Sequence, residues 1–324
     1  MSGTSIGSLR ERLRALGALP VHEERVLRQW ARAEPQSGGR RRPEHFLPLA
    51  LRDALPALEA EWRGLAVLRA DLAGQDGARR LLVELADGLS VEAVLLPRGG
   101  LCVSSQVGCA VGCTFCMTGV GGLERQLGSA EIVAQVALAR SLRPVTKVVF
   151  MGMGEPSHNL EAVLEAIDLL GNGGGIGHKN LVFSTVGDRR AFARLPQGRV
   201  KPALALSLHS TDPMLRERLL PRAPKVAPDE LVALGDAYAR ATGYPMQVQW
   251  TLLAGRHAVL NLIPYNDVPG LPFARPPQPH AETMARELHR RGILTKLRRS
   301  AGQDVEAGCG QLRARHVALP VRRQ

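Results

Sequence analysis

Apolar and polar residues alternate with two different spacings in the first 85 residues of the chain. Apolar side chains recur with helical spacing over residues 8–16 and 23–33, and an Arg-rich break follows at residues 36–42. Over residues 65–73 and 80–96 apolar and polar positions alternate one by one, which predicts the strands of a short sheet. We therefore expect a small, mainly helical N-terminal accessory domain at residues 1–85 and a larger core domain at residues 86–324.

The core domain repeats a strand, a loop and a helix. Largely apolar stretches, typical of strands covered on both faces, occupy residues 147–151, 180–184, 203–208, 246–253, 259–263 and 293–297, and an earlier one occupies 101–107. Helical patterns lie between them at residues 130–141, 160–170, 228–242 and 281–291. Alternating strands and helices predict a parallel sheet that is either doubly wound or closed into a barrel.

Short polar or glycine-rich motifs follow four of the predicted strands, at residues 152–156, 184–187, 207–209 and 264–266. In a parallel barrel all of these strand ends open onto one mouth, where active sites are built. A doubly wound sheet would spread the motifs more widely, apart from those at its switch point. The position of the motifs therefore favours the barrel.

One connection is too short for this pattern. Only five residues, 254–258, separate the predicted strands 246–253 and 259–263. Because a parallel crossover usually needs at least ~10–12 residues, these two strands are not expected to be parallel neighbours. Either a segment is missing from this sequence, or the barrel has lost a helix and has a hairpin or an unusual rim here.

The chain is strongly basic. Its 324 residues include 42 Lys and Arg against 30 Asp and Glu, which gives a formal net charge of +12. All but five of the basic residues are Arg, the side chain best suited to bidentate phosphate contacts, so the charge points to a polyanionic partner or to a compositional bias. No apolar run approaches the ~18 residues of a membrane span, and we expect a cytoplasmic protein without a membrane partner.

Four of the five cysteines lie close together, at Cys102, Cys109, Cys113 and Cys116, and the fifth is Cys309. Three thiolates within eight residues can hold an iron–sulfur cubane that keeps one iron open to a substrate. Zinc is the alternative, but a structural zinc site normally recruits its other ligands from a second close pair, which does not follow here. The spacing therefore favours a cluster.

These cysteines have the spacing Cys-x-x-x-Cys-x-x-Cys with Phe115 before the last one, and in this the chain resembles the radical S-adenosylmethionine (SAM) superfamily. Further motifs, at residues 102–109, 151–156, 206–209, 261–266 and 308–312, are similar to those of the RlmN/Cfr family of RNA adenine methyltransferases. The resemblance runs from about residue 92 to residue 312. It implies an α/β fold with a partial parallel (β/α)6 TIM-like barrel of the radical SAM type.

The resemblance also implies the cofactors and the residues that bind them. Cys109, Cys113 and Cys116 would hold a [4Fe-4S] cluster whose fourth iron chelates SAM. The family's SAM-contacting positions match Gly154, Glu155, Ser184, Ser207, Leu208, His209 and Asn266. A carboxylate suits the ammonium group of SAM, whereas hydroxyls, an imidazole and an amide suit its carboxylate and ribose. Taken alone, Ser184 or His209 would more often be a turn or packing residue.

Three further residues match the family's catalytic positions. Cys309, by itself an inert thiol, would accept a methyl group from one SAM, and a radical from a second SAM would activate that methyl for addition to an adenine carbon. Cys102 would then attack the Cys309 sulfur and release the RNA, leaving a disulfide that must be reduced. Glu92 would take the proton from the attacked carbon, unless it is a carboxylate on a surface strand.

The partner implied by the resemblance is large-subunit (23S) rRNA, with tRNA as a further candidate, and the target is carbon 2 of adenine, with carbon 8 as the alternative. Residues 1–85 would help to bind the RNA, although they are short and divergent. An electron donor such as flavodoxin or ferredoxin is implied, and we expect a monomer. Two other functions stay open, namely a radical SAM enzyme with another substrate and a non-catalytic iron–sulfur protein that binds RNA or senses redox state.

Overall fold

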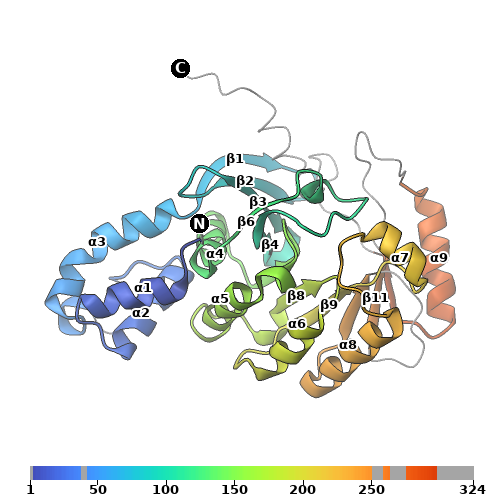
Figure 1. The fold of residues 1–324 in the computed structure, drawn as a ribbon. Coiled ribbons are helices and arrows are strands. Elements are labelled where there is room, and N and C mark those ends of the chain that lie inside the picture. The colour runs from blue at the N-terminus through green and yellow to red at the C-terminus, as the bar shows by residue number, and fades with distance from the viewer. Residues whose placement is uncertain (1–2, 38–41, 250–257, 263–274, 298–324) are drawn as a thin grey trace.

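A ten-stranded sheet extends through the molecule (Figure 1). The structure is a computed structural model and describes residues 3–37, 42–249, 258–262 and 275–297. The first four strands form an antiparallel meander of β1 (Val67–Ala73), β2 (Arg79–Glu84), β3 (Ser90–Leu96) and β4 (Gly100–Val103). Parallel pairing begins at β4 and continues through β7 (Lys147–Phe150), β8 (Leu181–Thr185), β9 (Ala203–Ser207), β10 (Met246–Gln249), β11 (Ala258–Leu262) and β12 (Thr295–Leu297).

Helices connect the parallel strands. They are α4 (Ser129–Leu142), α5 (Leu160–Asn172), α6 (Arg189–Arg194), α7 (Pro213–Leu219), α8 (Pro228–Thr242) and α9 (Gln278–Arg290). From β7 to β12 the strands lie in the sheet in the order in which they occur in the chain, as in a barrel, whereas a doubly wound sheet would reverse direction at a switch point. Within the described residues β1 and β12 are the edges of the sheet, so the predicted partial barrel is confirmed as an open one.

The two faces of the sheet have different roles. Side chains such as Val83, Leu101 and Phe183 point to one face and pack against the helices in one large apolar core. The pairing register places Glu92, Cys102, Ser184, Ser207 and Gln249 together on the opposite face, because directly paired residues point the same way and the side chains along a strand alternate. We call this opposite face the inner face.

Three N-terminal helices, α1 (Ile6–Ala15), α2 (Pro20–Ala31) and α3 (Leu49–Gly64), pack beside α4 and α5 (Figure 1). The Ile6 N–H donates to Ser129 Oγ at 2.7 Å, at the start of α4, and Arg140 donates to the Ala31 carbonyl at 2.6 Å. The strands that follow, β1 to β3, belong to the main sheet. The domain boundary proposed after residue 85 thus falls in the turn between two paired strands, β2 and β3, and stays a prediction.

The prediction that the strands around residue 250 are not parallel neighbours was wrong. Strand β10 pairs with β11 in parallel, with Met246 opposite Ala258. The reason lies in the length of chain between the described strands: β10 is described over Met246–Gln249 and β11 over Ala258–Leu262, with eight residues between them. Eight residues can span ~26 Å, twice the ~13 Å rise of a four-residue strand. The connecting residues themselves lie outside the described part of the chain.

The predicted strand at residues 101–107 is divided into two. Strand β4 ends at Val103, and β5 (Gln106–Gly108) pairs with β6 (Leu123–Gln126) in a separate two-stranded sheet. The cysteine segment is therefore the loop of a small hairpin at the end of the main sheet. In the described part of the chain, no helix combines the length and the apolar character needed to cross a membrane.

Candidate functional site

The loop between β5 and β6 contains the three clustered cysteines. The Cys109 N–H donates to the Gly122 carbonyl at 2.8 Å, and the Cys116 N–H donates to the Cys113 carbonyl at 3.0 Å. Cys109 is buried and the other two thiols are half-buried. Residues of the loop pack in a small apolar cluster that includes Val186 and Leu220. The loop thus presents three thiols from a firmly held backbone.

The electrostatics of this loop favour neutral thiols while nothing is bound. Burial raises the pKa of Cys109 to about 11, and the charges of Glu155 and Cys116 act in the same direction. Burial likewise raises the pKa of Cys113 far above its ordinary value. Since thiolates are the ligands of iron and zinc, a bound group must supply the positive charge that displaces these protons.

The donor set fits a cluster. Within the described residues, no three His, Cys, Asp or Glu side chains gather as a site for a single metal ion. Three soft sulfur ligands spread over one loop, with apolar residues behind them, are the set that an iron–sulfur cubane with one open iron needs.

Glu155 lies at the C-terminal end of β7, beside this loop. Its carboxylate accepts from the Val186 N–H at 3.0 Å and from the Ser157 N–H at 3.1 Å, and the side chain is 4% exposed. Gly154 has φ +104°, and a Cβ atom there would lie 2.7 Å from Gln106 Cβ. The glycine lets residues 152–155 lie directly on residues 103–106, which fixes the direction of the carboxylate.

The ends of β8 and β9 complete the same edge of the sheet. Ser184 is buried near the end of β8. Ser207 Oγ donates to Gln249 Oε1 at 3.0 Å, and the His209 N–H donates to the Gln249 carbonyl at 3.1 Å. The His209 ring lies 4.7 Å from the Phe115 ring, centroid to centroid. This contact joins the cysteine loop to the end of β9, so the structure brings the predicted cluster ligands and SAM-contacting residues together.

His209 and Leu208 differ in what their side chains can contribute. His209 has φ +61°, an unusual backbone conformation for a residue other than glycine and one often found at functional sites. Burial, with a contribution from the charge of Arg216, lowers the pKa of His209 to about 4, so the imidazole is neutral at physiological pH. Leu208 is fully buried in the main core, which leaves only its backbone available to a ligand.

Glu92 and Cys102 lie on the inner face, on the neighbouring strands β3 and β4. Cys102 pairs with Val94, two residues along from Glu92. Glu92 is 2% exposed and accepts from Arg80, with 2.9 Å between Oε2 and Nη2, so it is not a surface carboxylate. No disulfide joins the four described cysteines. The structure therefore places these two candidates on one surface next to the hairpin that bears the cysteine loop.

Sequence reasoning missed several polar residues that hold this site. Ser104, fully buried, donates to the Glu92 carbonyl at 2.5 Å and accepts from the Met153 N–H at 2.8 Å. Gln106 accepts from the Glu155 N–H at 2.7 Å. Gln249 bonds both Ser207 and His209. A polar residue inside a strongly apolar stretch was the available signal for Ser104 and Gln249. Asn266 and Cys309, also predicted for the site, lie outside the described residues.

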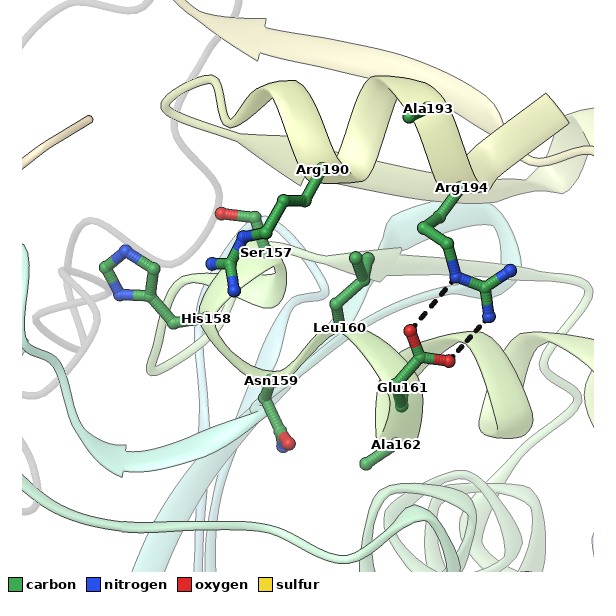
Figure 2. A pocket seen from close by; sticks show the side chains of 9 residues that line it. All are labelled: Ser157, His158, Asn159, Leu160, Glu161, Ala162, Arg190, Ala193 and Arg194. Atoms are coloured by element: carbon green, nitrogen blue, oxygen red, sulfur yellow. Dashed lines mark hydrogen bonds and ion pairs between the residues drawn. The ribbon is translucent and has the colours of Figure 1, made fainter. Parts of the chain in front are cut away.

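A hollow of about 550 Å³ opens beside this edge, between the start of α5 and one side of α6 (Figure 2). Its two guanidinium groups are already paired, Arg190 with Asp188 at 2.7 Å and Arg194 with Glu161 at 2.7 Å. None of the three clustered cysteines lines it. The hollow is therefore a feature of the rim, separate from the predicted cofactor site.

Comparison with known proteins gives concordant matches. Residues 103–241 match the model of the radical SAM superfamily. A probable RNA methyltransferase of Methylibium petroleiphilum is 69% identical, over 96% of this chain and 93% of that protein. One of Aromatoleum aromaticum is 67% identical, over 97% and 93%. The crystal structure of a radical SAM methyltransferase from Sphaerobacter thermophilus superposes with a TM-score of 0.78, at 30% identity, over 96% of this chain and 99% of that one.

Proposed function

Since the chain belongs to the radical SAM superfamily, as its near full-length relatives show, we propose that it is an RNA methyltransferase that acts on adenine. The target we propose is carbon 2, in 23S rRNA and also in tRNA. The observation that carries this proposal is the common placement of Glu92 and Cys102 on the inner face, next to the cysteine loop. The relatives named probable RNA methyltransferases support the substrate class.

The cofactors of the superfamily are a [4Fe-4S] cluster and SAM, and the residues at the sheet edge fit them. Cys109, Cys113 and Cys116 would hold the cluster. Glu155 accepts two backbone N–H groups, and a carboxylate has enough acceptor sites left for the ammonium group of SAM. When bound, the two cofactors supply a methyl group and one-electron chemistry.

Three residues of the protein would then each have one role in the methylation of adenine. Cys309 would hold the methyl carbon on its sulfur, so that this carbon, after losing one hydrogen atom to the bound cofactors, can form a bond to the ring of adenine. The unpaired electron left on the adduct would return to the cofactors. Glu92 accepts the proton that leaves the attacked carbon. Cys102, as its thiolate, attacks the Cys309 sulfur, and the sulfur–carbon bond breaks with its electron pair going to the carbon, which takes up a proton to become the methyl group. A Cys102–Cys309 disulfide forms and is reduced by an external thiol.

The first experiment tests the covalent step on the protein. Protein is purified anaerobically with a full cluster, supplied with SAM and digested. The mass of the peptide that contains Cys309 is then measured by mass spectrometry. We expect one added methyl group on that peptide in the wild type and none in the Cys309→Ala variant. An unmodified Cys309 in fully loaded protein would overturn the proposal.

A second experiment tests the role of Cys102 and the target. The Cys102→Ala variant should accumulate a covalent protein–RNA complex, because nothing then attacks the Cys309 sulfur. Adding Cys309→Ala in the same chain should abolish that complex. Nucleoside mass spectrometry of rRNA and tRNA from the wild-type reaction distinguishes methylation at carbon 2 from methylation at carbon 8, or at neither.

A further inference from the structure

Helix α7 and the residues directly after it pack against the cysteine loop, and we call this segment, residues 213–222, the α7 wall. The Thr114 N–H donates to the Leu219 carbonyl at 3.0 Å, and the Arg222 N–H donates to the Val111 carbonyl at 3.2 Å. Leu220 packs in the same apolar cluster as Cys109. The backbone between the cysteines is thus bonded to this wall at both ends.

Arg216 is the buried charged group of this wall, whereas Arg222, beyond α7, is exposed and lies against Gly112 of the cysteine loop. The Arg216 side chain is only 5% exposed, although it lies on a short helix whose neighbouring residues are exposed. Its Nη2 donates to the Val186 carbonyl, and the N–H of the same Val186 donates to Glu155. A single residue of backbone therefore separates the guanidinium from the carboxylate predicted to bind SAM.

Among the described residues, no ion pair balances the positive charge of this guanidinium. In the described part of the chain no carboxylate lies within 4.0 Å of it, and its buried Nε–H has no hydrogen-bond partner. Burial lowers the pKa of Arg216, and the acidic groups of Cys113 and Glu155 oppose that shift without cancelling it. An arginine stays protonated under such conditions.

A buried cation without an ion pair is costly unless a ligand brings negative charge. Three thiolates around a [4Fe-4S] core leave the site with net negative charge, which increases by one when the cluster is reduced. We propose that Arg216 is the buried counter-charge of the cluster site and makes one-electron reduction of the cluster easier. The proposal rests on the cluster assignment and is independent of the RNA substrate.

The alternative is that Arg216 only ties α7 to Val186. The two roles can be separated because Arg216→Gln keeps an N–H donor and removes the charge, whereas Arg216→Lys keeps the charge. Arg218 is the matched control, since it lies on the same helix and is exposed.

The test is a redox titration of the protein with its cluster, without SAM or RNA, using dithionite as reductant and electron paramagnetic resonance as readout. For Arg216→Gln we expect the equilibrium constant for reduction to fall about tenfold, which is about 59 mV toward more negative potential for one electron. Arg216→Lys and Arg218→Gln should remain close to the wild type. An Arg216→Gln variant with the wild-type potential would overturn the proposal.

If the Arg216→Gln variant does not retain the cluster, its redox potential cannot be measured, and the cluster content of the variants is compared instead. Iron and sulfide are then measured on protein whose circular dichroism shows that it is folded. Arg216→Lys that keeps the cluster and the wild-type potential supports a role of charge. Arg216→Lys that loses the cluster, or shifts in potential as far as Arg216→Gln, overturns it.

Discussion

Gly154 shows how a single backbone position controls the cofactor site. Its φ of +104° is unfavourable for any residue with a Cβ atom, and that atom would also lie within 2.8 Å of Gln106 and Ser105. Both neighbours belong to the segment that supports Glu155. A side chain at this position would therefore push the carboxylate away from the bonds that orient it.

We expect Gly154→Ala to lower the free energy of unfolding by about 1–3 kcal/mol and to weaken SAM binding. Urea denaturation and calorimetric titration of the cluster-loaded protein with SAM measure the two effects. Gly121→Ala is the control, because that glycine is exposed and no atom of the described residues lies within 4 Å of the place that a Cβ would take. Equal SAM affinity in the two variants would show that Gly154 does not position the site.

At the residue scale, the sequence indicated which residues lie near one another but not which groups they bond. The cysteine segment and the motif at residues 152–156 lie together at one edge of the sheet, as the motif positions predicted, and their roles stay predictions. Arg80, the partner of Glu92, comes from the next strand of a hairpin and was not foreseen. The burial of Arg216 depends on how α7 packs on the cysteine loop, which no local pattern encodes.

At the scale of elements, Ser104 connects the end of β4 to three neighbouring segments. Its hydroxyl bonds the Glu92 carbonyl on β3 and the Met153 N–H after β7, and its backbone exchanges hydrogen bonds with the Gln135 side chain on α4. The residue thus sets how the strand with Cys102 lies relative to the loop with Glu155.

Removing this hydroxyl leaves a buried N–H without its acceptor, so we expect Ser104→Ala to cost about 1–3 kcal/mol of stability. Chemical denaturation measures the loss. Ser141→Ala is the comparison, since the Ser141 hydroxyl bonds only a carbonyl within its own exposed helix turn, and we expect less than about 0.5 kcal/mol there. Similar losses in the two variants would contradict the role given to Ser104.

The lengths of elements were the weakest part of the sequence interpretation. The alternation in residues 80–96 correctly predicted the strands β2 and β3. Successive side chains of these strands point alternately to the apolar core and to the inner face. In contrast, the apolar stretch at 246–253 was assigned as a whole to one strand, of which the structure describes Met246–Gln249 as β10. The resulting five-residue connection suggested a topology that the parallel pairing of β10 and β11 excludes.

At the scale of the whole molecule, the N-terminal helices and the parallel part of the sheet share one apolar core. Leu27 of α2, Trp62 of α3, Ile132 of α4 and Leu206 of β9 all belong to it. Backbone contacts reinforce the junction, because the Ala130 N–H donates to the Thr4 carbonyl at 3.1 Å. A shared core of this kind links the unfolding of the two parts.

We therefore expect a single unfolding transition in urea. Trp30 and Trp62, whose rings lie 5.2 Å apart, report on the N-terminal helices, and Trp250→Phe removes the third tryptophan from the signal. Fluorescence of that variant should change at the same urea concentration as circular dichroism at 222 nm, which follows all helices. A fluorescence transition at lower urea would mean that the N-terminal helices unfold independently.

The two faces of the sheet also differ in what a substitution on each of them would change. Neighbouring residues of one strand, such as Phe183 and Ser184, belong to different faces, one packed against helices and one turned to the inner face. A substitution at the first position changes the packing against the helices, whereas a substitution at the second changes the surface that the inner face presents. A lineage could thus exchange one RNA target for another through alternate positions of the same strands, while the helix packing that it inherited stays unchanged.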